Sequence, residues 1–214
     1  MKNMHEDSPL YAVFAKRTEY RVGEENAALW DVDAWYGTPS DKFYVQSEGE
    51  NDGDRANAST ELYWNHAVSP FWDVRLGARY DAVANNEDRA FLAAGYQGTA
   101  PYMVDVEAAA YVSDRGEASA RIEMTRDVYL TQKIAVQPRF ETELAFSDAK
   151  RYAVAQGVTR MEAGLRVRYE IRRRFAPYLG AEYGRALGES AGAARARGDV
   201  AESVDFLLGA AWRF

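Results

Sequence analysis

Apolar and polar residues alternate strictly along long stretches of the chain. Between positions 161 and 172, apolar side chains occupy every odd position, whereas charged residues or glycine occupy every even one. An ordinary strand has about five or six residues, and a strand that crosses a membrane at a tilt needs about nine to eleven. A period of two held over this length therefore predicts a membrane-spanning strand.

The same alternation recurs along nearly the whole sequence. We mark twelve such segments, at 10–21, 27–37, 42–50, 59–69, 71–82, 89–99, 102–113, 116–131, 133–147, 159–173, 175–187 and 200–214. Short links at 38–40, 69–70, 100–101, 132 and 174 alternate with longer polar ones at 50–58, 83–88, 148–158 and 188–199. This arrangement predicts an all-β fold, an antiparallel up-and-down transmembrane β-barrel of twelve strands with both termini on the periplasmic side. Ten strands is the alternative.

Three places depart from the simple pattern. Lys16 falls on the same face as Phe14, so the first segment is the least regular. Arg126 is in phase with the apolar residues around it, which implies either that its side chain reaches an interface or that a bulge shifts the register. The glycine-rich stretch 188–198 has no phosphate-loop spacing, and we interpret it as a mobile external loop.

The charged face of the segments is expected to line the lumen. Two interpretations of it remain open. The first is a lattice of cross-strand ion pairs that fills the barrel, and the second is a cation path favoured by an excess of carboxylates. The residues with the inward phase are Asp31, Asp33, Glu48, Asp73, Arg75, Arg79, Asp105, Glu107, Arg121, Glu123, Arg139, Glu141, Glu143, Arg166, Arg168, Glu170 and Glu182.

Composition narrows the class of protein. The 214 residues carry a formal net charge of −7 and contain no cysteine, which argues against a nucleic-acid partner and excludes disulfides and thiolate metal sites. The mean hydropathy is −0.47, and no apolar run is long enough for a membrane helix. The start of the chain lacks the apolar stretch of a signal peptide. We expect a flexible periplasmic tail at 1–9 followed by one barrel domain at 10–214.

Several stretches resemble one known family. They are WNHAVSPFWDVRLGARYD (64–81), GYQGTAPYMVDVEAAAYVSDRGEASARIE (95–123), YLTQKIAVQPRFE (129–141) and GLRVRYEIRRRFAPYLG (164–180). They are similar to the copper-resistance outer-membrane protein B family (CopB/PcoB). The resemblance implies a copper-tolerance component of the outer membrane that works beside a periplasmic multicopper oxidase. Members usually carry a Met- and His-rich segment before the barrel, and here only Met4 and His5 represent it.

The resemblance makes copper ions the expected ligand. Cu(I) prefers thioether and imidazole groups, so Met4 and His5 in the tail are candidate ligands. The phase of Met103 places it in the lumen beside Asp105 and Glu107, close to the periplasmic mouth. These five residues form the predicted metal site.

The expected function is therefore an outer-membrane copper-resistance barrel that binds copper ions and passes them across the membrane. A plugged structural or adhesive barrel without transport, and a soluble ligand-binding barrel, are the alternatives. We do not expect an enzyme, because the two histidines, His5 and His66, lie away from the external loops where outer-membrane hydrolases place their catalytic groups. The expected partners are outer-membrane lipid, copper ions and the multicopper oxidase, without nucleic acid.

Overall fold

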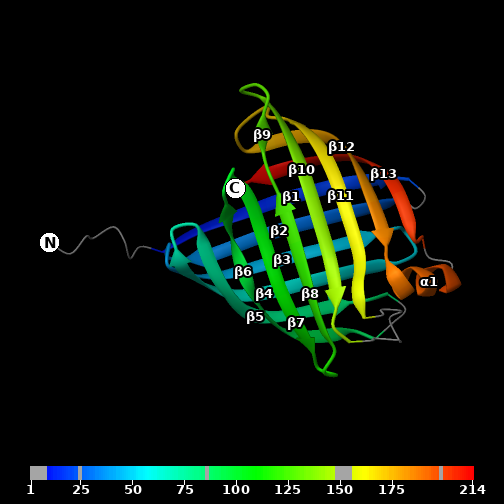
Figure 1. Cartoon of the computed structure of the whole chain (residues 1–214). Coiled ribbons are helices and arrows are strands. Elements are labelled where there is room, and N and C mark those ends of the chain that lie inside the picture. Colours follow the sequence, from blue (N-terminus) through cyan, green and yellow to red (C-terminus); the bar gives the residue numbers. More distant parts are fainter. Residues whose placement is uncertain (1–8, 24–25, 85–86, 148–155, 198–199) are drawn as a thin grey trace.

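Twelve long antiparallel strands form one closed barrel (Figure 1). The computed structural model describes residues 9–23, 26–84, 87–147, 156–197 and 200–214. The strands are β1 (Leu10–Val22), β2 (Ala27–Gly37), β3 (Asp41–Asn51), β4 (Ala56–Ser69), β5 (Trp72–Ala82), β6 (Arg89–Ala100), β7 (Val104–Ser113), β8 (Ala118–Thr125), β9 (Val128–Tyr129), β10 (Ile134–Ala145), β11 (Gly157–Tyr169), β12 (Phe175–Ala186) and β13 (Glu202–Arg213). Consecutive long strands pair with each other, the short β9 pairs with β10, and β13 closes the ring on β1. The predicted twelve-stranded up-and-down barrel is confirmed.

The two ends of the barrel differ. One end, which we call the turn end, carries the short connections 38–40, 70–71 and 101–103 together with the start of β1 and the end of β13. The opposite loop end carries the connections 52–55 and 83–88 and a helix, α1 (Gly188–Arg197). The helix corrects the prediction of a mobile loop there. Alanine and arginine favour a helix, and Glu189 lies in its first turn, where a negative charge stabilises the helix dipole.

A bulge in β1 explains the irregular first segment. The pairing of β1 with β2 shifts between Ala15 and Arg17, so one extra residue is accommodated at Lys16. As a result Lys16 and Arg17 both point into the lumen, where they form ion pairs with Asp33 and Asp31. The bulge thus places two consecutive cations inside the barrel.

The predicted segment 116–131 is divided into β8 and β9. Thr125 pairs with Arg139 and Val128 pairs with Val136, so the register is unchanged across the gap. The Arg126 amide donates to the Pro138 carbonyl at 3.2 Å, but Pro138 has no amide hydrogen to donate in return. The strand is therefore interrupted by a missing ladder bond, and the suggested register shift is wrong.

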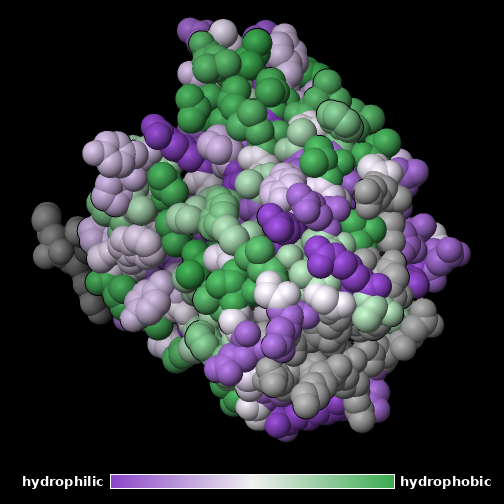
Figure 2. Space-filling view, turned by 45° about the vertical axis from the view of Figure 1, so that its right-hand side comes forward, coloured by the Kyte–Doolittle hydropathy of each residue, from purple (hydrophilic) through white to green (hydrophobic). Residues whose placement is uncertain are grey.

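The outer wall of the barrel is apolar. Large hydrophobic side chains are exposed on it, including Leu62, Leu76, Leu92, Leu165, Leu179, Phe206 and Leu208. In Figure 2 the loop end is turned forward, and hydrophobic side chains cover the upper part of the wall while hydrophilic ones gather toward that end. Among the described residues, no helix is both long and apolar enough to cross a membrane. The charged face of the strands lies inside, as the alternation predicted.

Close approach of β4 and β5 makes Gly77 a sensitive position. A Cβ atom at Gly77 would lie 1.9 Å from the Leu62 carbonyl oxygen, which is backbone and cannot move aside. We expect Gly77→Ala to lower the free energy of unfolding by about 1–3 kcal/mol, because overpacking forces the strands apart. Urea unfolding of the detergent-solubilised barrel measures this. Gly192→Ala is the control, since a Cβ in that helix meets no atom within 4 Å, and equal stability of the two variants would contradict the prediction.

Candidate functional site

The lumen contains a cavity at each end. The turn-end cavity has a volume of about 360 Å³, and the loop-end cavity about 340 Å³. Arg17 and Arg139 line both of them. These two arginines therefore belong to the layer of side chains that separates the cavities, which we call the waist.

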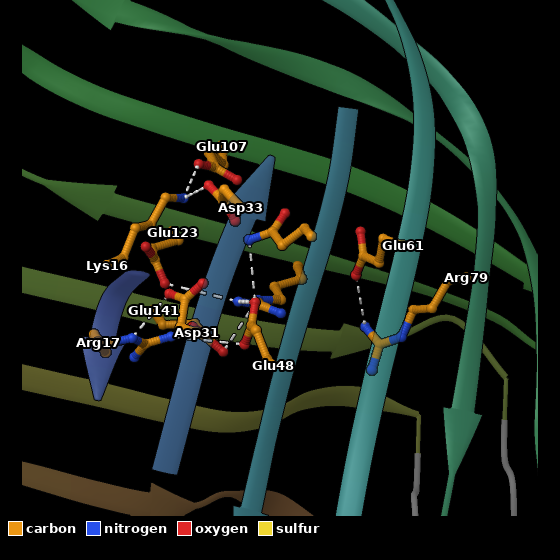
Figure 3. Close-up of polar contacts among 12 residues, drawn as sticks. Lys16, Arg17, Asp31, Asp33, Glu48, Glu61, Arg79, Glu107, Glu123 and Glu141 are labelled. Carbon is orange, nitrogen blue, oxygen red and sulfur yellow. Dashed lines mark hydrogen bonds and ion pairs between the residues drawn. The ribbon is translucent and has the colours of Figure 1, made fainter. Parts of the chain in front are cut away.

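Two ion pairs cross the lumen between distant strands, and Figure 3 shows the one between Lys16 and Glu107. Lys16 on β1 lies 2.9 Å from Glu107 on β7, six positions away around the twelve-stranded ring. Arg121 on β8 lies 2.6 Å from Glu48 on β3, five positions away. Because each pair joins opposite walls, the lumen is bridged rather than open at these points.

Arg139 is the centre of the densest charge cluster in the waist. It is 6% exposed and lies 2.8 Å from Glu123, 3.1 Å from Glu162 and 3.3 Å from Glu182, and it also pairs with Glu141. These carboxylates come from β8, β11, β12 and β10. One guanidinium thus contacts four carboxylates from four strands through charge-assisted hydrogen bonds.

Next to Arg139 lies a second buried pair. Arg166 is 1% exposed and lies 2.9 Å from Glu19 and 3.2 Å from Glu182. The Tyr178 hydroxyl also donates to Glu19, at 3.0 Å. The ion-pair lattice expected from the sequence is therefore present, and in this part of the lumen it joins β1, β8, β10, β11 and β12.

Aromatic side chains fill the other side of the lumen. Tyr44, Tyr63, Phe91 and Tyr111 form a buried cluster, with Tyr63 fully buried. The Arg75 guanidinium lies 4.0 Å from the ring centroid of Tyr63 and 4.9 Å from that of Tyr44, within the range of cation–π contact. This half of the interior is consequently packed more like a protein core than like a water channel.

Two aspartates beside the waist are incompletely bonded. Asp31 and Asp33 are 3% and 0% exposed, and both line the turn-end cavity. In each of them Oδ2 is bonded to a basic side chain, whereas Oδ1 has no hydrogen-bond partner. Buried carboxylate oxygens are normally satisfied, so the two unpartnered oxygens on neighbouring aspartates are an unusual feature of the lumen.

The predicted metal site is brought together only in part. Asp105 and Glu107 both line the turn-end cavity, where Asp105 accepts a hydrogen bond from Thr99 at 2.8 Å and Glu107 pairs with Lys16 and Arg75. Met103 differs from expectation, because it lies in the β6–β7 turn and is 75% exposed. Met4 and His5 lie outside the described residues. Within the described part of the chain, no group of three or more His, Asp or Glu residues is arranged to hold a metal ion.

The turn geometry explains the position of Met103. The backbone reverses through Tyr102 and Met103, which have φ values of 66° and 58°. Two successive residues in the left-handed region break the alternation, so the phase of β7 cannot be extended back to Met103. Because Met103 lies in this turn and not on a strand, its side chain is exposed instead of pointing into the lumen.

Lys16 and Arg17 were missed as lumen residues by sequence reasoning. The available signal was the phase conflict at Lys16, but an alternation pattern alone does not say which way a bulge turns the flanking side chains. The inward position of both side chains depends on the register in which β1 pairs with β2.

Two solved barrels share this architecture. The NanC porin superposes with a TM-score of 0.60 at 13% identity, covering 95% of this chain and 99% of that chain. The KdgM porin gives 0.59 at 8% identity, covering 96% and 99%. At such low identity the likeness concerns the fold alone.

Sequence relatives are more specific. A family model described as copper resistance protein B precursor (CopB) matches residues 10–214. Copper resistance protein B of Escherichia coli is 35% identical over 209 residues, which cover 97% of this chain and 70% of that protein. The copper resistance protein B homolog of Pseudomonas syringae pv. tomato is 36% identical over 192 residues, covering 88% and 65%. With a barrel of this form and a match over nearly its whole length, the chain belongs to the copper resistance protein B family.

Proposed function

We propose that this barrel stands in the outer membrane and passes copper ions through its lumen. Membership of the copper resistance protein B family supports a role in copper resistance. The apolar outer wall suits a lipid environment, and the fold resembles that of porins. Orientation follows the usual rule for such barrels, with the turn end in the periplasm.

The charge of the loop-end cavity carries the proposal. Seven carboxylates and five arginines line it, so the entrance from that end is net acidic. A low-dielectric wall that carries excess negative charge attracts cations and repels anions. The acidic residues are Glu48, Glu50, Asp81, Glu141, Glu143, Glu162 and Glu182.

Copper binding at the turn end is part of the same proposal. Asp105 and Glu107 supply oxygen atoms in the turn-end cavity, and the exposed thioether of Met103 lies at the same end. Met4 and His5 of the tail complete the proposed ligand set for copper at the periplasmic mouth. By the family resemblance, a periplasmic multicopper oxidase is the proposed recipient or donor of these ions.

Copper uptake into proteoliposomes tests the proposal. Vesicles with the folded barrel and an enclosed copper-sensitive dye are expected to respond to external copper faster than protein-free vesicles. Heat-modifiable gel migration shows whether the barrel is folded in each preparation. Uptake equal to that of empty vesicles, with a folded barrel, would overturn the proposal.

The second candidate is a plugged structural barrel that makes the same wall but transports nothing. The observation that favours it is the waist, where the Lys16–Glu107 and Arg121–Glu48 pairs bridge the lumen. If the barrel is plugged, vesicles that contain it should take up copper no faster than protein-free vesicles. The same uptake measurement therefore distinguishes a transporting barrel from a structural one.

A further inference from the structure

One aspect of the lumen is unexplained by an ion-pair lattice. Asp33 Oδ2 is 2.6 Å from the Lys16 ammonium and also accepts a hydrogen bond from Tyr44, while Asp31 Oδ2 accepts one from Arg17 Nε at 3.0 Å. The second oxygen of each aspartate, Oδ1, is buried and without a partner among the described residues. Leaving such an oxygen unsatisfied is costly, which points to a ligand that supplies the missing positive charge or donor.

The two aspartates are near enough in the strand to share one ligand. Asp31 and Asp33 are alternate residues of β2, so their side chains lie on the same face of the strand. Both line the turn-end cavity, which at about 360 Å³ has room for an ion with several water molecules. Figure 3 shows Asp33 close to Lys16 and Glu107, and Asp31 close to Arg17.

The donor atoms determine which ion fits. The described residues that line the two cavities include no methionine or histidine, and their acceptors are carboxylate, amide and hydroxyl oxygens. Such oxygens suit hard or borderline divalent ions, whereas Cu(I) prefers sulfur and imidazole. Because no three carboxylates of the described chain are arranged to hold a metal ion, the ion would keep much of its water.

We propose that Asp31 and Asp33 form a lumen subsite for a hydrated divalent cation, and that Lys16 is its built-in competitor. The assignment of that ion as Cu(II) rests on the proposed copper passage, but the subsite itself does not. The Lys16 ammonium already pairs with Asp33 and Glu107, and its positive charge repels an arriving cation. Weak binding of this kind lets an ion leave a conduction path again.

Titration of Mn²⁺ into the folded full chain tests the subsite, with free Mn²⁺ measured by electron paramagnetic resonance. Mn²⁺ prefers oxygen ligands and so largely avoids the methionine and histidine of the tail. We expect Lys16→Met to tighten Mn²⁺ binding by about tenfold, because the competing charge is removed. We expect Asp31→Asn combined with Asp33→Asn to weaken binding by about tenfold or more, since the charged ligands are lost.

Lys42→Met is the matched control. Lys42 also faces the turn end of the lumen, where it pairs with Asp73 at 2.8 Å, so this variant removes the same charge without touching the proposed subsite. Its Mn²⁺ affinity should change by less than about twofold, the effect of general charge alone. Ag⁺, a soft ion, should bind the double asparagine variant as it binds the wild type.

Two results would overturn the subsite. They are equal tightening by the two lysine variants, and Mn²⁺ binding unchanged in the double asparagine variant. Misfolding cannot imitate the gain of affinity expected for Lys16→Met. The copper uptake experiment is independent of this one, since a barrel that binds Mn²⁺ at the subsite but takes up no copper contradicts only the proposed passage.

Discussion

The single-channel conductance of the barrel in planar bilayers is expected to rise by roughly tenfold when Lys16 and Arg121 are both replaced by alanine, because constrictions in the lumen limit ion flow. These two residues form the ion pairs that join opposite walls, with Glu107 and Glu48. Their removal takes away the bridging side chains and two positive charges, while Glu107 keeps its contact with Arg75 and Glu48 its contact with Arg17. The current is therefore expected to become more cation-selective, which the reversal potential in a salt gradient measures.

A double variant with the same charge change serves as the control. Arg21→Ala with Lys42→Ala removes one lysine and one arginine whose pairs, with Glu50 and Asp73, join strands only two positions apart in the ring. This variant should keep a conductance close to that of the wild type. A comparable rise in both double variants would show that lost charge, rather than lost bridges, opens the lumen.

Arg139→Met is expected to cause the largest loss of stability, about 3 kcal/mol, because it leaves buried carboxylates without their shared cation. Glu123, Glu141, Glu162 and Glu182 all contact this guanidinium. Some compensation remains, since Glu182 also lies 3.2 Å from Arg166. The free energy of unfolding in urea, followed by tryptophan fluorescence in detergent, measures the effect.

Arg172→Met gives the comparison for that loss. Arg172 is exposed in the connection between β11 and β12 and forms no ion pair within the described chain. Its replacement should change the free energy of unfolding by less than about 0.5 kcal/mol, as is usual for surface substitutions. A similarly small change for Arg139→Met would mean that the cluster contributes little net stability.

Much of the barrel could be predicted because its wall repeats a simple rule. Each strand has the apolar outer wall on one side and the charged lumen on the other, so the period of two gives the number of strands, their approximate bounds and the inward set that includes Asp31, Asp33 and Arg139. Local exceptions were harder to predict. The glycine-rich stretch after β12 forms the helix α1 rather than a loop. Met103 lies in a turn and not in the lumen, because Tyr102 and Met103 adopt left-handed backbone conformations before β7 begins.

The alternation of side chains along the chain is thus sufficient to predict the class of fold. It also predicts which face of each strand is apolar and which is charged, because both depend on residues two positions apart. The site depends on a different kind of neighbour. Lys16 meets Glu107 only because the ring closes with β1 opposite β7 and because a bulge turns Lys16 inward. Which carboxylates are neutralised, and which oxygens of Asp31 and Asp33 stay free, follows from these contacts across the lumen between residues that are far apart in the sequence.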